Sequence, residues 1–184
     1  MVPAILILTM ATGLKNITGL LGSDVFVETA LSGAGTLYNF LPAIIFVVAC
    51  FLAFSTGTSW GTFGILIPIV TYIFAGSESS ELMIIGISAC LAGAVCGDHC
   101  SPISDTTVLS STGGSCNHIV HVMTQLPYGL TVGFSAFCGF LFGGLTGQEI
   151  ASIGVTAVVF CVAMLVLKAV AATGLSVKEV NDYI

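Results

Sequence analysis

The sequence has very few charged residues. Asp, Glu, Lys and Arg make up 7% of its 184 residues, and none of them is arginine, whereas a typical soluble domain has about a quarter. Because a soluble domain needs a polar outer surface, this scarcity excludes a soluble globular protein. A mean hydropathy of +1.11 and a hydrophobic content of 56% predict an all-α integral membrane protein surrounded by lipid.

Other absences exclude further classes of protein. The start, MVPAILILTM, lacks the cationic region of a secretory signal, and more hydrophobic segments follow it. A net charge of −6 without any basic run argues against a nucleic-acid partner. The seven cysteines, an odd number, lie mostly in apolar runs, so we interpret them as small residues at helix contacts and not as a disulfide framework.

The apolar runs predict several membrane segments. A helix that crosses the hydrocarbon core needs about 20 residues, and only the last two runs, expected as helices over 125–145 and 150–170, reach that length without help. Glycines 139, 143 and 147 favour close helix contact there. We expect a multi-pass protein of the cell membrane (inner or plasma membrane), with a transmembrane domain over 1–175 and a polar tail over 176–184. The six apolar runs lie near 2–14, 40–54, 62–75, 82–96, 126–146 and 150–172.

Two of the runs are too short to span and flank a polar stretch. Leu41–Phe54 and Phe63–Ala75 lie on either side of STGTSWGT (55–62), and each would make about 20 Å of helix against a core of about 30 Å. Together they predict either one broken helix or a re-entrant hairpin, and their equal lengths slightly favour the hairpin. Exposed backbone at that depth is tolerated only where it is buried in protein or lines a cavity.

The next segment repeats this pattern. Glu81–Cys96 is apolar, GDHCSPIS (97–104) interrupts it, and a short helix can resume over 105–111. Pro102 cannot continue a helix without a kink, and Ser101 is a potential N-cap for the helix that follows. The pattern predicts a discontinuous transmembrane helix.

Two carboxylates lie in this second interruption. Asp98 and Asp105 would sit at a depth where charge is costly, and intramembrane carboxylates usually belong to ion or proton routes. Na⁺ prefers carboxylate, hydroxyl and carbonyl oxygens, and competition between Na⁺ and H⁺ for a carboxylate is the simplest basis for antiport. Both interruptions also supply hydroxyl oxygens, from Ser55, Thr56, Thr58 and Ser59 in the first and from Ser101, Ser104, Thr106 and Thr107 in the second.

Each of these features also has a purely structural interpretation. Asp105 could complement the dipole in the first turn of a helix, and Asp98 could be a solvated turn residue at an aqueous mouth. Gly57 and Gly61 could form a helix-packing face, and Trp60 could be an interfacial anchor.

A set of cysteines and histidines offers a rival site. Its six members could bind zinc, but their spacing matches no standard zinc signature. His118 and His121 are expected near a membrane surface, where they could sense pH or have no special role. The set comprises Cys96, His99, Cys100, Cys116, His118 and His121.

Two stretches closely resemble a known family. FSTGTSWGTFGILIPI (54–69) and GDHCSPISDTTVLSSTGGSCNHIVHVMTQLPY (97–128) are similar to the NhaC-type Na⁺/H⁺ antiporter family of the ion transporter superfamily, and LKNITGLLG (14–22) is a looser match. The resemblance covers about residues 3–170. It implies two inverted repeats, each with a re-entrant hairpin and a discontinuous helix, of which this chain would be the second, with the hairpin at 41–75 and the discontinuous helix at 81–112.

The resemblance also implies a function. Members exchange Na⁺ for H⁺, and some relatives move small organic acids or amino acids with Na⁺ or H⁺. It implies a transporter and not an enzyme, with no cofactor beyond the transported Na⁺ and H⁺, and Na⁺ bound at Asp98 and Asp105. The ion- or substrate-binding positions carried over are Ser55, Thr56, Thr58, Ser59, Asp98, Ser101, Ser104, Asp105 and Thr106.

The length departs from the family pattern. Members are about twice as long, and no first repeat is visible in this sequence. We therefore expect a missing N-terminal repeat or another chain, or a homo-oligomer, and no transport by this chain alone. The alternatives to Na⁺/H⁺ antiport are a Na⁺- or H⁺-coupled carrier of an organic acid, a membrane metalloprotein, and an inactive fragment or assembly subunit; the absence of arginine slightly weakens the carrier hypothesis.

Overall fold

The computed structural model describes residues 39–74 and 80–172, together with the single positions 9, 13, 17 and 20. The predicted first segment and the polar tail over 176–184 lie outside this part of the chain, apart from those single positions. The described residues contain helices and no strand, so the all-helical prediction is confirmed. The helices are α3 (Leu41–Thr56), α4 (Ser59–Phe74), α5 (Ser80–Cys100), α6 (Asp105–Gly113), α7 (His118–Thr146) and α8 (Glu149–Ala172).

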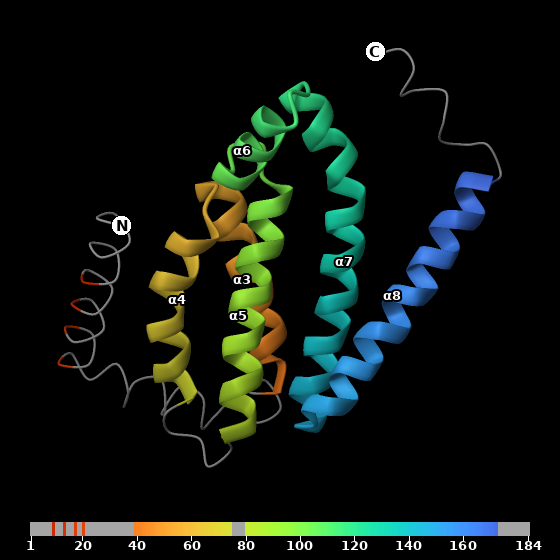
Figure 1. Ribbon diagram of the computed structural model, residues 1–184. Helices are drawn as coiled ribbons and strands as arrows, with labels where there is room; N and C mark the ends of the chain where they lie inside the picture. The colour runs from red at the N-terminus through yellow and green to blue at the C-terminus, as the bar shows by residue number, and fades with distance from the viewer. Residues whose placement is uncertain are drawn as a thin grey trace.

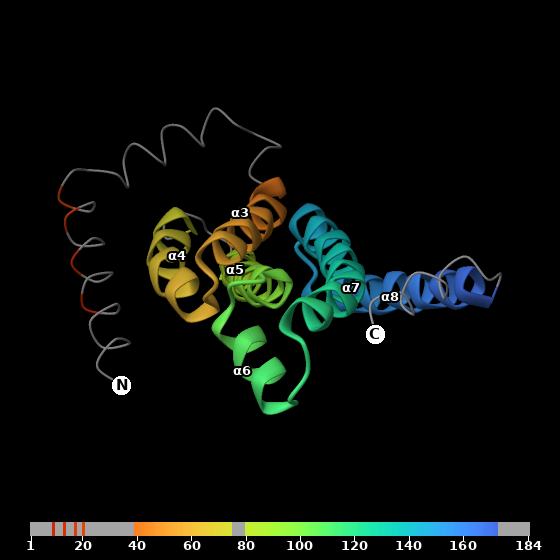
Figure 2. The same cartoon turned by 90° about the horizontal axis from the view of Figure 1, so that it is seen from above.

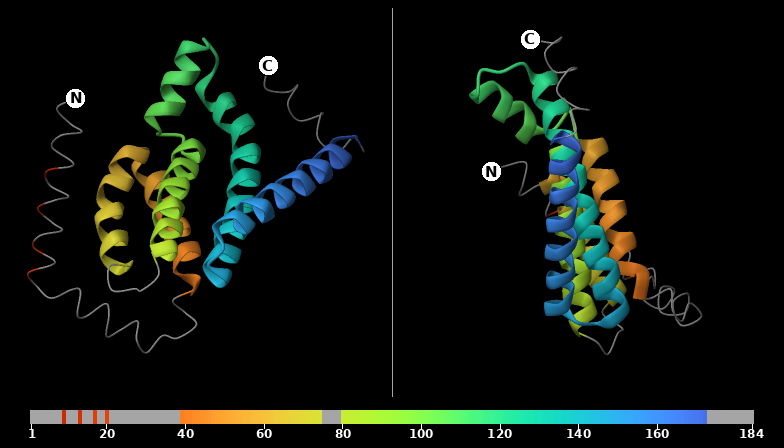
Figure 3. Two further views of the ribbon diagram at one scale, coloured as in Figure 1. Left: turned by 60° about the horizontal axis from the view of Figure 1, so that its bottom comes forward. Right: turned by 90° about the vertical axis from the view of Figure 1, so that its right-hand side faces the viewer.

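The helices form an up-and-down bundle with one outlying member, in which α3 and α5 run in one direction and α4 and α7 in the other (Figure 1). α3 and α4 make a hairpin beside α5, and α7 packs on the other side of α3 and α5 (Figure 1). Seen from above, α6 projects from one side of the bundle and α8 contacts only its α7 edge (Figure 2). The left view of Figure 3 shows α8 leaning away from α7 along its length.

The core lies between α3, α4 and α5. Phe46, Val70 and Phe74 are buried there, and the Phe46 ring also lies 5.6 Å from that of Phe140 on α7. In contrast, α8 carries exposed apolar side chains along its length, such as Ile153 at 70% exposure. A helix that is apolar on its outer face is expected to face lipid.

Helix lengths separate membrane-spanning candidates from shorter elements. Glu81–Cys100, His118–Thr146 and Glu149–Ala169 are each long and apolar enough to cross a membrane. α3 and α4 have 16 residues each, which gives about 24 Å of helix against a hydrocarbon core of about 30 Å. As predicted, neither of them alone is long enough to span.

The first interruption is shorter than predicted. α3 continues through Ser55 and Thr56, and only Gly57 and Thr58 separate it from α4. The hydroxyls of Ser55 and Thr56 each donate to the carbonyl four residues earlier, at 2.8 Å. Such bonds satisfy a hydroxyl inside an apolar helix. We expected the helix to end before these polar residues, but it continues through them.

The second interruption also begins later than predicted. α5 continues through Gly97 to Cys100, and only Ser101–Ser104 are not helical. The predicted N-cap, Ser101, is wrong: Ser104 caps α6, and its Oγ accepts hydrogen bonds from the backbone N–H groups of Thr106 and Thr107. The Ser101 hydroxyl is instead committed to a tertiary contact, since it donates to the Phe54 carbonyl of α3 at 2.7 Å.

The helix after α6 starts earlier than predicted. α7 begins at His118 and not at Gln125. Asn117 caps it, since its side-chain oxygen accepts hydrogen bonds from the N–H groups of Ile119 and Val120 at 3.0 and 3.3 Å. Pro127 lies inside α7 without ending it.

Small residues allow the close helix contacts. In α5, a Cβ on Gly93 would meet the carbonyl oxygen of Phe46, and one on Gly97 would meet that of Cys50. In α7, a Cβ on Gly139 would meet the Thr156 hydroxyl of α8. The predicted close contact at Gly139 and Gly143 is thereby confirmed, whereas Gly147 instead ends α7 with a φ of +68°.

The cysteines belong to the same packing. All seven are free thiols. Cys96 and Cys100 of α5 lie opposite glycines of α7, since a Cβ on Gly133 would approach the Cys96 sulfur to 2.6 Å and one on Gly129 would approach the Cys100 sulfur to 2.9 Å. These two cysteines are small helix-contact residues, as predicted.

The α3–α5 contact gives a first prediction. Gly97→Ala should lower the free energy of unfolding by about 1–3 kcal/mol, because the added methyl has no space against the Cys50 carbonyl. Gly154→Ala in α8 is the matched control: nothing lies within 4 Å of its Cβ position, so stability should stay the same or rise by up to about 1 kcal/mol. Thermal unfolding of the purified variants in detergent measures both, and equal stability of the two would contradict the packing.

Candidate ion-binding site

Four helix ends meet on one side of the bundle. α3 ends and α4 begins at Gly57–Thr58, and α5 ends and α6 begins around Ser101–Ser104 (Figures 1 and 2). Two hydrogen bonds join these interruptions: the Ser101 hydroxyl donates to the Phe54 carbonyl at 2.7 Å, and the Asp105 backbone N–H donates to the Gly57 carbonyl at 3.2 Å. The structure thus brings together two segments that are more than 40 residues apart in sequence.

Gly57 is required at this junction for two reasons. Its φ is +69°, a left-handed conformation that glycine adopts without steric cost. A Cβ at this position would also lie 2.5 Å from the Ile103 carbonyl oxygen. Gly57 therefore packs against the second interruption, and does not form the helix-packing face with Gly61 that the spacing allowed.

Asp98 is the buried carboxylate of the junction. It lies in the last turn of α5 and is only 3% exposed. Its Oδ1 accepts a hydrogen bond from the Ser104 hydroxyl at 2.7 Å, and its Oδ2 accepts one from the Thr106 hydroxyl at 2.6 Å. Lys168, the lysine within the continuously described residues, is not paired with it, so within that part of the chain this carboxylate is held by hydroxyl donors and by no opposite charge.

Asp105 has a different environment. Its side chain is exposed, and it occupies the first turn of α6, directly after the Ser104 cap. A negative charge there complements the helix dipole. This position agrees with the purely structural interpretation of Asp105 given above. The two carboxylates are therefore not equivalent.

The predicted hydroxyls of the first interruption are arranged differently from those of the second. Those of Ser55 and Thr56 donate within α3, and the Thr56 hydroxyl also lies 3.3 Å from that of Thr62 on α4. Thr58 Oγ1 accepts a long hydrogen bond of 3.4 Å from the Gly61 N–H. Ser59 begins α4 and is half-buried. Of the predicted positions, the structure brings Ser104 and Thr106 to Asp98 and uses Ser101 to tie the two interruptions together.

The inward face of α6 carries hydroxyl groups. Ser104 at its cap and Thr107 and Ser111 along it are at most 2% exposed, whereas Val108 and Leu109 are 43% and 72% exposed. Thr107 was one of eight candidate hydroxyls, and the family resemblance did not single it out. Its spacing of three residues from Ser104 would have placed it on the same helix face.

Histidines connect α7 to this region. His118 bonds through Nε2 to the Pro102 carbonyl at 2.7 Å and through Nδ1 to the Ser111 hydroxyl at 3.0 Å. It therefore joins the second interruption to α6 and α7. No sequence signal singled out this structural role.

The cysteines and histidines of the rival set do not converge. Within 39–74 and 80–172, no three Cys, His, Asp or Glu side chains form a group that could hold a metal ion. His99 bonds to the Val95 carbonyl of its own helix, His121 to the Ser110 hydroxyl, and Cys116 to the Ser111 carbonyl.

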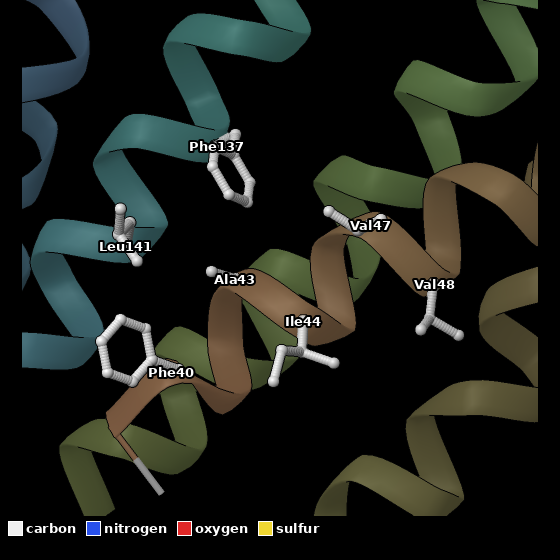
Figure 4. Close-up of a pocket in the computed structure, with 7 residues that line it drawn as sticks. All are labelled: Phe40, Ala43, Ile44, Val47, Val48, Phe137 and Leu141. Carbon is white, nitrogen blue, oxygen red and sulfur yellow. The ribbon is translucent and has the colours of Figure 1, made fainter. Parts of the chain in front are cut away.

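An apolar groove lies elsewhere on the bundle. It has a volume of about 300 Å³ between α3 and α7, and Figure 4 shows aliphatic and aromatic side chains around it. It contains no polar side chain and none of the predicted site residues. Its lining residues are Phe40, Ala43, Ile44, Val47, Val48, Phe137 and Leu141.

Comparison with known proteins identifies the family. Residues 1–145 match the model of the Na⁺/H⁺ antiporter family. This chain belongs to that family. The match includes both interruptions and Asp98, so the residues around the junction are those of a family of secondary transporters, and the chain is a membrane protein.

Individual relatives are much longer than this chain. An uncharacterized protein of Haemophilus influenzae is 47% identical over 165 residues, 90% of this chain and 31% of the relative. The malate-2H(+)/Na(+)-lactate antiporter of Bacillus subtilis is 33% identical over 103 residues, 53% of this chain and 22% of the relative. An uncharacterized Na(+)/H(+) antiporter of H. influenzae is 34% identical, with 51% of this chain and 24% of the relative covered. No solved structure matches the chain significantly.

The tie between the interruptions gives a second prediction. Ser101→Ala should lower the free energy of unfolding by about 1–3 kcal/mol, because the Phe54 carbonyl at the end of α3 loses the donor that the fully buried Ser101 supplies. Ser55→Ala is the control, since its exposed hydroxyl only bonds back to its own helix. Thermal unfolding should show a loss for Ser101→Ala alone, and an equal effect of both substitutions would contradict the role of Ser101.

Proposed function

We propose that the full-length protein exchanges Na⁺ for H⁺ and that both ions compete for Asp98. The observation that carries this proposal is a carboxylate buried at the meeting of four helix ends, with a hydroxyl donor on each of its oxygens. The membership of this chain in the Na⁺/H⁺ antiporter family supports the same function. Oxygen atoms of this kind suit Na⁺ as a ligand set.

Burial of Asp98 explains why exchange would be coupled. A bare carboxylate in a low-dielectric interior is costly, whereas a carboxylate that carries Na⁺ or H⁺ is neutral overall. On one side of the membrane Asp98 releases Na⁺ and takes up a proton, and on the other it releases the proton and takes up Na⁺. Each event exchanges one positive charge for another at the same oxygens, so the loaded forms move and the bare anion does not.

Two of the four helix ends at the junction favour a cation, whereas the amino-terminal ends of α4 and α6 have the opposite polarity. The carboxyl-terminal ends of α3 and α5 carry partial negative charge, and both lie at the junction. Asp105 is the second predicted Na⁺ ligand, and its exposed position on the first turn of α6 suits an approaching cation. The hydroxyls of Ser55, Thr56, Thr58 and Ser59 are predicted to contribute when the hairpin tip moves during transport.

The proposal includes a membrane arrangement. We propose that α3 and α4 form a re-entrant hairpin with its tip at Gly57–Thr58, and that α5 and α6 form a discontinuous helix in the second of two inverted repeats. α7 supports this arrangement: its 29 residues make about 44 Å of helix, and it extends beyond the tip of the shorter hairpin (Figure 1). The other repeat would come from residues outside these 184 or from another chain, in a multi-pass protein of the cell membrane.

A second candidate function is exchange of small carboxylic acids coupled to Na⁺ or H⁺. The observation that favours it is the similarity to the malate-2H(+)/Na(+)-lactate antiporter of Bacillus subtilis. Against it stands the absence of arginine, the usual bidentate ligand of a carboxylate. Ser104 also already occupies the first free N–H groups of α6, which an organic anion would otherwise bind.

Ion exchange by vesicles gives a third prediction. Everted vesicles with the full-length protein should show Na⁺-driven proton movement, and Asp98→Asn should reduce its rate at least about 100-fold because the neutral amide cannot exchange one cation for the other. Asp105→Asn, a matched change at the exposed carboxylate, should have a smaller effect. Full exchange by Asp98→Asn would exclude Asp98 as the shared site. The same vesicles are also tested for exchange of labelled malate for lactate. Such exchange would favour the second candidate if the vesicles show no Na⁺/H⁺ exchange when malate and lactate are left out.

A further inference from the structure

One hydroxyl of the junction has no hydrogen-bond partner. Among the described residues, two buried side-chain polar atoms lack one, the Tyr72 hydroxyl and Thr107 Oγ1. Tyr72 lies near the end of α4 that is remote from the junction, whereas Thr107 lies on the first turn of α6. Buried polar atoms are nearly always paired, so an orphan in a functional region indicates a partner such as a water or an ion.

The other buried hydroxyls at the junction are occupied. Ser101 donates to the Phe54 carbonyl, Thr62 donates to the Thr58 carbonyl, and Ser104 donates to Asp98. Thr106, which is exposed, also donates to Asp98. Among these hydroxyls, that of Thr107 is therefore the one without a hydrogen-bond partner, although its side chain is only 2% exposed.

The cap of α6 links Thr107 to Asp98 through a single oxygen atom. The Ser104 oxygen accepts from the Thr107 backbone N–H at 3.3 Å and donates to Asp98 Oδ1 at 2.7 Å. One serine oxygen thus contacts both residues. Thr107 also lies on the buried side of α6, away from the exposed Val108 and Leu109.

We propose that Thr107 Oγ1 is a ligand of the cation carried at Asp98 and contributes directly to its affinity. This assignment rests on the proposed Na⁺ exchange at Asp98. Hydroxyl oxygens are suitable ligands for Na⁺, and the cation supplies the partner that Thr107 lacks. Among the described residues, no protein group bonds to this buried hydroxyl.

The orphan hydroxyl makes a structural role and a ligand role distinguishable. Valine has nearly the shape of threonine without the polar oxygen, and removal of an unsatisfied buried polar group is neutral or favourable for folding. Thr107→Val should therefore keep or raise the melting temperature without Na⁺, while it weakens Na⁺ binding. A residue that only packs would show no separate change in Na⁺ affinity.

The test uses purified full-length protein in detergent at one alkaline pH. Its melting temperature is measured as NaCl replaces KCl at constant total salt, because a ligand that binds only the folded state raises the midpoint. Thr107→Val and the smaller Thr107→Ala should both require an about tenfold or higher Na⁺ concentration for half of the full shift, and Thr107→Ser should restore the wild-type value. Thr112→Val is the matched control, since the exposed Thr112 hydroxyl bonds to the Val108 carbonyl on the same helix.

The outcomes separate this inference from the function on which it rests. If the wild type shows a Na⁺-specific shift and the two variants without a hydroxyl respond at the same Na⁺ concentration, Thr107 is not a ligand although Na⁺ binds. If the wild type itself shows no shift with Na⁺, the proposed Na⁺ site at Asp98 fails, and the assignment of Thr107 fails with it. Weaker Na⁺ binding by both variants, with rescue by serine and no effect of Thr112→Val, supports the assignment.

Discussion

Backbone contact between α3 and α5 positions the other parts of the structure. Gly93 and Gly97 lie directly against carbonyl oxygens of α3, so the two helices approach more closely than side chains would allow. The end of α3 therefore reaches the end of α5, where Ser101 can donate to the Phe54 carbonyl. Without this contact, the two interruptions would not meet and Asp98 would have a different environment.

The polar junction supplies hydrogen-bond partners for the free backbone groups of the helix ends that this packing leaves inside the bundle. Free carbonyl and N–H groups of helix ends need partners when they are buried, and here the second interruption supplies several of them. Ser104 is central, because one oxygen caps α6 and donates to Asp98. Any change of ion at Asp98 is thus coupled to the start of α6, and through His118 to α7. These bonds give a physical route by which ion exchange could alter the arrangement of helices.

Composition and local pattern predicted much of the fold. The scarcity of charge predicted the membrane helices, Pro102 predicted a break, and the short runs on either side of residue 57 predicted two short helices. The exact limits were not predictable from residue type alone. Ser55 and Thr56 are typical of loops, but bonds to their own helix keep them helical, and Ser101 and Ser104 are equally good caps until tertiary contact occupies Ser101.

The candidate site was predicted as a set, but its internal order was not. Asp98 and Asp105 have identical chemistry, and only packing of α5 against its neighbours buries the first and leaves the second exposed. The eight candidate hydroxyls were likewise equivalent in sequence. Their separate roles depend on the helix face that each occupies after folding. The helix face depends in turn on where each helix begins and ends, and a few side-chain hydrogen bonds determine those limits.

Calorimetry of Na⁺ binding tests the central claim most directly. Purified full-length protein is titrated with Na⁺ in two buffers of different ionisation enthalpy, at a pH where the exchanger is active, so that protons released on binding change the measured heat. If Na⁺ displaces H⁺ from Asp98, the wild type should release protons as Na⁺ binds, and Asp98→Asn should not. Na⁺ binding to the wild type without proton release, or undiminished release by Asp98→Asn, would contradict competition at this carboxylate.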